Sequence, residues 1–211
     1  MLAGLEQGGI IALVSDAGTP LISDPGFKLV CAVREAGFDV FTVPGASAVT
    51  AALSISSAPT DAFTFGGFLP NKAEARTKHL TRFLAHDCTL VFFESAARLM
   101  ASLKAIGEVY GDRRLSIARE LTKLFEEVVE GTADGLIAHY EQSKPKGEIV
   151  IVVHAPKPVM VTEADIIELL SNSLVTMSVK DAADHVATTL SVPRKLAYQH
   201  ALTLKRAADE K

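Results

Sequence analysis

The sequence contains no tryptophan and only two cysteines, Cys31 and Cys88. Two thiols so far apart do not form a disulfide framework, and this usage is typical of a reducing compartment. No apolar run reaches the roughly eighteen residues that a membrane-spanning helix needs. The N-terminus also lacks the basic start and apolar core of a secretion signal. We therefore expect a cytoplasmic protein without a membrane partner.

An excess of positive charge is also missing. Lysine and arginine number 21 against 25 acidic residues, for a net charge of −4. This balance argues against a general nucleic-acid coat protein, but it allows an enzyme that docks RNA through a local basic patch. The six histidines show no metal-ligand spacing with cysteines or carboxylates, so we expect no metal. The remaining composition, 48% hydrophobic and 22% charged, is that of a globular protein.

Apolar runs alternate with helical patterns along most of the chain. Such alternation predicts an α/β fold with a largely parallel sheet. The expected strands are Ile10–Val14, Val40–Val43, Thr89–Phe93, Leu115–Ala118, Val128–Glu130 and Ile149–Val153. The expected helices are Phe27–Ala36, Ala46–Ile55, Ala73–Leu84, Ala96–Tyr110 and Leu136–Gln142.

Two breaks, at Ser56–Asp61 and Ala155–Pro158, divide the chain into three expected parts. Residues 1–57 and 58–156 form two α/β lobes, and residues 157–211 form a small helical domain. Helix-start signals at Thr162, Ser178 and Ser191 give this domain three helices, the last two spaced as in a helix-turn-helix. A plain helical appendage fits equally well. Basic residues, which include Arg194 and Lys195, favour contact with RNA.

The most informative segment is the loop Ser15–Gly26, which follows one expected strand and precedes a helix. It is rich in Gly, Pro, Ser and Asp, and it is longer than an ordinary strand-to-helix loop. In open α/β sheets, ligands bind at the carboxyl ends of the strands. Gly18 and Gly26 let the backbone approach a ligand or adopt positive φ. We therefore predict that this loop binds a ligand.

The same loop, S-D-A-G-T-P-L-I-S-D-P-G, resembles the signature of the tetrapyrrole methylase superfamily. Within this superfamily, its sequence is similar to that of the bacterial 16S rRNA cytidine 2′-O-methyltransferases. Further matching motifs follow in the order that this family has them. They are Val43–Ala48, Gly67–Pro70, Phe92–Ser95 with Arg98-Leu99, Ala118–Lys123 and Lys146–Val153.

The resemblance implies a two-lobed tetrapyrrole-methylase-like fold with S-adenosylmethionine in the cleft, and a homodimer. It implies 2′-O-methylation of a cytidine ribose in 16S rRNA, so that the partner is this RNA or the small ribosomal subunit. The family begins with a strand and a Pro-Ile-Gly-Asn-Leu type loop, whereas this chain begins at Met1-Leu2-Ala3. We therefore expect a truncated first lobe.

The usual G-x-G-x-x-G fingerprint of dinucleotide sites is absent. The turn Pro44–Ala48 opens an expected helix, and its small residues suit either a ligand carboxylate at the helix amides or tight helix packing. The resemblance implies a set of cofactor contacts. These are Ala17, Gly18, Thr19, Ile22, Ser47, Ala48, Phe93, Glu94, Leu121 and Thr122.

Methylation of a ribose hydroxyl needs a positioned acceptor and a group that takes its proton. Candidate bases are Asp16, Glu94 and Glu120, each of which also suits a structural role. A basic stretch, which includes Lys72, Arg76 and Lys78, either contacts RNA phosphates or is solvated surface. Two alternative functions stay open: methylation of a small tetrapyrrole, and a non-catalytic RNA-binding or assembly protein with a residual cofactor cleft.

Overall fold

The computed structural model describes residues 1–157 and 161–209, with side chains through residue 206. The chain divides into two compact units after Lys157. Pro158, the last residue of the predicted break, lies outside the described residues. Each unit is described by itself.

The first unit is built on a five-stranded sheet with the order β1-β2-β5-β3-β4. Its strands are β1 (Phe63–Phe68), β2 (Thr89–Ser95), β3 (Leu115–Arg119), β4 (Glu127–Gly131) and β5 (Glu148–Val153). Only β1 and β2 are parallel, and the other three pairs are antiparallel. The prediction of a largely parallel sheet was therefore wrong. β5 inserts between β2 and β3 with the opposite direction, and apolar periodicity carries no information on direction.

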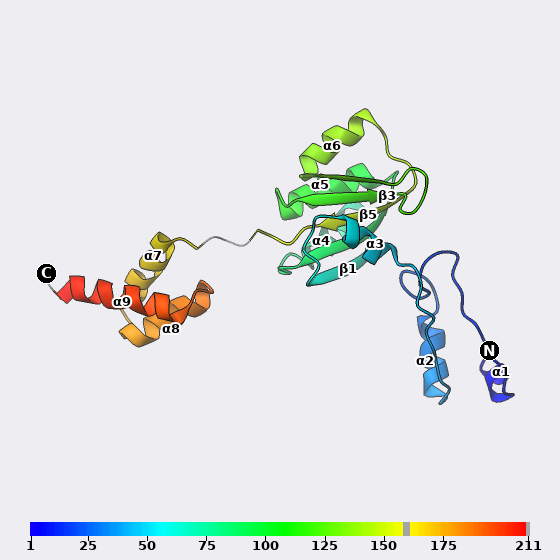
Figure 1. Cartoon of the computed structure of the whole chain (residues 1–211), viewed down its shortest axis with the longest axis horizontal. Helices are drawn as coiled ribbons and strands as arrows, with labels where there is room; N and C mark the ends of the chain where they lie inside the picture. The colour runs from blue at the N-terminus through cyan, green and yellow to red at the C-terminus, as the bar shows by residue number, and fades with distance from the viewer. Residues whose placement is uncertain (158–160, 210–211) are drawn as a thin grey trace. The chain divides into compact units, whose positions relative to one another are not determined.

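Helices cover both faces of this sheet (Figure 1). On one face lie α4 (Ala73–Thr81), α5 (Leu99–Tyr110) and α6 (Ala133–Gln142). On the other face α3 (Ala48–Ile55) packs on a second cluster that contains Val91, Ala118 and Val152. Because both faces are covered, β2 and β5 are continuous apolar runs rather than alternating ones.

Residues 1–47 contain two helices, α1 (Leu2–Glu6) and α2 (Phe27–Glu35). The expected strands Ile10–Val14 and Val40–Val43 are absent, and Ile10 is 99% exposed. A strand is stable only when its backbone groups pair with a neighbouring strand. No described segment pairs with these two, so both predictions were wrong.

The second unit consists of α7 (Glu163–Ser173), α8 (Val179–Thr189) and α9 (Arg194–Asp209), which share one apolar core (Figure 1). Thr162 and Asp165 form a complete capping box on α7, and the Ser178 hydroxyl caps α8. These contacts confirm the predicted helix starts at Thr162 and Ser178. Within the described residues, no helix is both long and apolar enough to span a bilayer.

Candidate active site

The two predicted ligand loops of the N-terminal segment lie against each other. The Thr19 hydroxyl donates to the carbonyl oxygen of Ala46 at 3.4 Å. Gly18 has a φ of +73°, and a Cβ added there would lie 3.8 Å from the same oxygen. The Ser15 hydroxyl donates to the Gly18 carbonyl at 3.1 Å, which closes the loop on itself. The structure therefore brings the Gly18 loop and the Pro44–Ala48 turn together.

Helix α3 connects that turn to the sheet. Its N-cap residue Ser47 makes no side-chain cap hydrogen bond, so the first amides of the helix have no capping side chain. The helix packs on the apolar cluster to which Phe93 and Leu121 attach. Val49, Ala52 and Leu53 of α3 thus share this cluster with the two side chains. In the part of the chain that the structure describes, no hydrogen bond joins the segment Ala17–Ile22 to the sheet.

The loop after β3 has a strained backbone held by charge. Glu120 and Thr122 both have positive φ, at +49° and +63°, which non-glycine residues rarely adopt. The Glu120 carboxylate accepts from the Glu148 amide at 3.0 Å and from Lys123 Nζ at 2.9 Å. A Cβ on Gly147 would lie 2.1 Å from Glu120 Oε1, so only glycine leaves room for this carboxylate.

These contacts bear on the role expected for Glu120. The Glu148 amide and the Lys123 ammonium hold the pKa of Glu120 below its usual value, which makes it a weaker base. In this structure Glu120 clamps the loop, and its catalytic role stays a prediction. The neighbouring amide of Thr122 donates to Glu126 Oε2 at 2.5 Å, so it is already satisfied.

Glu94, at the end of β2, is 2% exposed. One carboxylate oxygen accepts from Arg98 Nε at 2.7 Å and from the Ser95 amide, and the other accepts from the Ser102 hydroxyl at 2.5 Å. Both carboxylate oxygens thus have partners within the protein. Glu94 positions Arg98, which donates to the Asn71 side chain, and its role as a base stays a prediction.

Asp16 differs from the other two candidate bases. It is exposed in the Gly18 loop, and no described residue makes a hydrogen bond to its side chain. It is thus the one candidate base whose carboxylate is not committed to a described structural contact.

The basic stretch divides into buried and exposed members. Arg76 is only 6% exposed, and its guanidinium donates to the carbonyl oxygens of Pro70 and Asn71. Arg76 therefore holds the loop before α4 in this structure, and its predicted phosphate contact stays a prediction. Lys72 and Lys78 are exposed.

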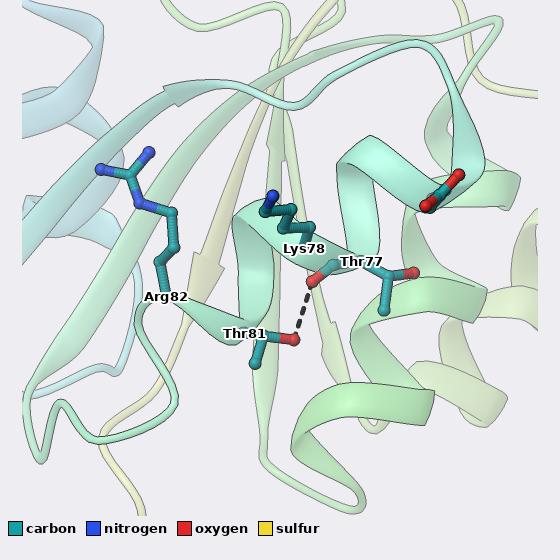
Figure 2. Close-up of a pocket in the computed structure, with 5 residues that line it drawn as sticks. Thr77, Lys78, Thr81 and Arg82 are labelled. Atoms are coloured by element: carbon teal, nitrogen blue, oxygen red, sulfur yellow. Dashed lines mark hydrogen bonds between the residues drawn. The ribbon is translucent and has the colours of Figure 1, made fainter.

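A shallow hollow of about 650 Å³ lies on the outer face of α4 (Figure 2). Figure 2 shows Lys78 and Arg82, one turn apart, reaching to the same side of the helix. Thr77, Thr81 and Glu74 complete its lining. Arg82 belongs to the basic stretch that the sequence predicts as a phosphate contact, and its spacing of four residues from Lys78 places both on one side of the helix.

In the second unit, the Arg194 side chain makes contacts between helices α8 and α9. It donates to Asp184 of α8, and its guanidinium lies 5.9 Å from the Tyr198 ring centre. The bond from Arg194 holds the pKa of the Asp184 carboxyl below its usual value. Lys195 is exposed on α9. Arg194 thus joins α8 to α9, whereas no described residue makes a hydrogen bond or ion pair with the Lys195 side chain.

A polar cluster around Glu130 was not predicted. Glu130 Oε1 accepts from the Ser57 hydroxyl at 2.6 Å, from the Ser57 amide at 3.0 Å and from the Ser116 hydroxyl at 3.0 Å, and Arg114 pairs with the other oxygen. The same Ser116 hydroxyl lies 2.8 Å from Nε2 of the buried His154. These residues are far apart in sequence, so no local pattern could have found the cluster. Across the described chain, no group of three or more potential metal ligands gathers.

Comparisons with known proteins agree with this architecture. Residues 1–137 match the family of Tetrapyrrole (Corrin/Porphyrin) Methylases, and residues 161–205 match the RsmI C-terminal HTH domain. In solved structures, a cobalt precorrin-4 methyltransferase has a TM-score of 0.54 at 18% identity, covering 72% of this chain and 67% of its own. The methyltransferase CobJ has a TM-score of 0.56 at 20% identity, covering 76% and 71%. These likenesses concern the fold.

Relatives in sequence carry the name "Ribosomal RNA small subunit methyltransferase I". The protein of Mesorhizobium japonicum is 42% identical over all of this chain and 72% of its own length. That of Xylella fastidiosa is 43% identical over 94% of this chain and 74% of its own. For the relative from Erythrobacter litoralis, 48% identical over 82% of this chain, the match spans 61% of its own length.

Proposed function

Because this chain belongs to the tetrapyrrole methylase family, and within it to the ribosomal RNA small subunit methyltransferase I proteins, we propose that it methylates a ribose 2′-hydroxyl of a cytidine in 16S rRNA. The observation that carries the proposal is identity of 42–43% with these relatives over at least 94% of the chain. The likeness to corrin enzymes is 20% or less and concerns the fold alone, so it gives tetrapyrrole methylation less support.

We propose that S-adenosylmethionine lies between the two N-terminal loops and the carboxyl ends of the strands. The residues fit such a ligand. The positive φ of Gly18 lets its backbone turn towards a ligand, and the uncapped start of α3 suits a carboxylate. Phe93 and Leu121 offer apolar surface. When bound, the cofactor supplies an electrophilic sulfonium methyl group. The full set of proposed contacts is Ala17, Gly18, Thr19, Ile22, Ser47, Ala48, Phe93, Glu94, Leu121 and Thr122.

The chain's own residues then have three tasks. The loop from Glu120 to Glu126, clamped by Lys123 and Glu148, holds a fixed wall beside Phe93. Positioning of this kind supplies a large share of rate enhancement in a transfer that needs little covalent chemistry. For the proton of the ribose hydroxyl we propose Asp16, because its carboxylate is not committed elsewhere among the described residues. RNA phosphates are proposed to contact Lys72, Lys78 and Lys195.

Three further features belong to the same proposal. We propose a homodimer that works in the cytoplasm on the small ribosomal subunit. Residues 1–57 and 58–156 are proposed as the two lobes that enclose the cofactor, and residues 157–211 as the helical domain. The match of residues 161–205 to an HTH domain supports contact of that domain with nucleic acid.

Transfer of a tritiated methyl group tests the reaction. Purified small subunits that lack the modification are incubated with the chain and labelled S-adenosylmethionine. We expect label in the RNA, on ribose, where it yields a dinucleotide that resists alkaline cleavage because the 2′-oxygen is blocked. A tetrapyrrole precursor offered in parallel should stay unlabelled. Label on the tetrapyrrole, or binding of RNA without any transfer, would replace the proposal by one of the two alternatives.

A further inference from the structure

Strand β1 contains an irregularity that its sequence requires. Phe65 pairs with Val91 and Phe68 pairs with Phe93, so three steps on β1 match two steps on β2. The extra residue forms a β-bulge at Gly66-Gly67. Gly67 has a φ of +70°, and a Cβ on Gly66 would lie 2.3 Å from the ring of Phe92. Both glycines are needed, one for conformation and one for space.

The bulge decides which face Phe68 occupies. Side chains alternate along a regular strand, so Phe65 and Phe68 would point to opposite faces of the sheet. With the extra residue, both lie against Phe93, with ring centres 4.8 Å and 5.4 Å from it. Phe93 is one of the proposed contacts of S-adenosylmethionine. The bulge therefore places a third aromatic ring on the face that carries the candidate site.

Phe68 is 53% exposed although its two partners are half-buried. The loop that follows it, Leu69–Lys72, is nevertheless held firmly. Arg76 donates to the Pro70 and Asn71 carbonyls, and Arg98 donates to the Asn71 side chain while anchored at 2.6 Å on the buried Glu94. Two arginines thus fix a loop beside an exposed ring. This is the arrangement of a preformed binding surface rather than of a loose surface turn.

Resting on the proposed function, we propose that Phe68 is the surface on which a nucleobase of the RNA substrate stacks. Proteins hold unpaired RNA bases on aromatic rings, and this contact tolerates any base because every base has a π-face. Lys72, at the end of the clamped loop, is exposed and offers positive charge for the adjoining phosphate. The adenine of the cofactor has the same stacking chemistry, and the experiment separates the two sources.

The chain supplies a matched control for this test. Phe63 lies at the other end of β1, is also aromatic and is 44% exposed. Phe68→Ala and Phe63→Ala are compared in the full chain, by binding to unmethylated small subunits and by calorimetry with S-adenosylmethionine. We expect Phe68→Ala to weaken RNA binding roughly five- to hundredfold. Phe63→Ala should change it less than about twofold, and both variants should keep cofactor affinity.

A third variant, Phe68→Leu, retains apolar packing but not the aromatic face, and circular dichroism checks that each variant is folded. Intermediate loss of RNA binding by Phe68→Leu supports stacking. Equal effects at Phe63 and Phe68 would overturn the proposal, and so would loss of cofactor affinity alone at Phe68. Methyl transfer by the wild-type chain is scored separately. If the wild-type chain labels RNA but Phe68→Ala binds RNA as well as Phe63→Ala does, only the stacking role is wrong. If Phe68→Ala alone loses RNA binding but the wild-type chain labels no RNA, only the proposed reaction is wrong.

Discussion

Glu130 shows how one side chain can join distant parts of the chain. It lies on β4, at an edge of the sheet, and it binds Ser57 from the segment that follows α3. The Ser57 hydroxyl and amide, with help from Arg114 and Ser116, lower the pKa of Glu130 from its ordinary value of 4.5 to about 2. A carboxylate whose pKa falls on folding stabilises the folded state only while it is ionised.

This linkage gives a pH-dependent prediction. The contribution of Glu130 is present above about pH 4.5 and is lost as the pH falls towards 2. Glu130→Gln should therefore lower the free energy of unfolding by about 1 kcal/mol at pH 7, as for a charged hydrogen bond near the surface. At pH 3 the difference from wild type should shrink. Urea unfolding at both pH values measures it.

The control for that measurement is Glu108→Gln, which changes an exposed carboxylate on α5. Its effect should be small at both pH values. If Glu130→Gln lowered the free energy of unfolding equally at both pH values, the charge of Glu130 would not be what holds Ser57 to the sheet.

Motifs in the sequence name residues, but they do not show which neighbours those residues contact. Glu94 and Arg76 lie where the motifs put them, yet one positions an arginine and the other holds a loop. Whether a carboxylate or guanidinium faces a substrate or a neighbouring chain segment depends on contacts between residues far apart in sequence. Those contacts follow from packing, which residue type and spacing do not encode.

Among the elements, buried strands and amphipathic helices were the most predictable. The predicted ranges for β2, β3, β5 and α2 differ from the observed ones by one or two residues at an end. Two kinds of strand were predicted poorly: one that was missed and one that does not form. β1 was missed because Gly66-Gly67 interrupts its apolar pattern, and 10–14 was predicted although no neighbour pairs with it. A strand depends on its partner, whereas a helix satisfies its own backbone.

The basic residues of helix α4 lead to a prediction about RNA binding. Lys78 on α4 and Arg82 at its C-cap carry like charge four residues apart and line the same hollow, where both can meet an RNA phosphate. The double change Lys78→Ala and Arg82→Ala should weaken RNA binding and flatten its dependence on salt. The slope of log affinity against log salt should fall by about 1.4 if both contact phosphates of single-stranded RNA.

Lys104→Ala, on the exposed side of α5, is the control for general charge loss. It should alter the salt slope of RNA binding by less than the double change Lys78→Ala and Arg82→Ala does. An α4 double variant that retains the wild-type slope would return Lys78 and Arg82 to ordinary solvated surface.

At the scale of the whole molecule, the two units have separate cores. The second unit buries its own cluster around Leu170, Val186 and Ala201. We expect residues 158–211 to form a helical domain on their own, with a cooperative thermal transition seen by circular dichroism. A chain that stops at Lys157 should keep cofactor binding and lose part of its affinity for small subunits. A helical piece without a cooperative transition would show that the cluster needs the rest of the chain.

The outer strands of the sheet have one more consequence. Each edge of an open sheet presents backbone groups to which a strand of another molecule can add, and uninterrupted edges seed fibrils. In β1 the additional residue at Gly66-Gly67 breaks the even spacing of those groups, and β4 carries Glu127 and Glu130. One border is irregular and the other carries two carboxylates, so concentrated solutions should resist fibril growth through this sheet.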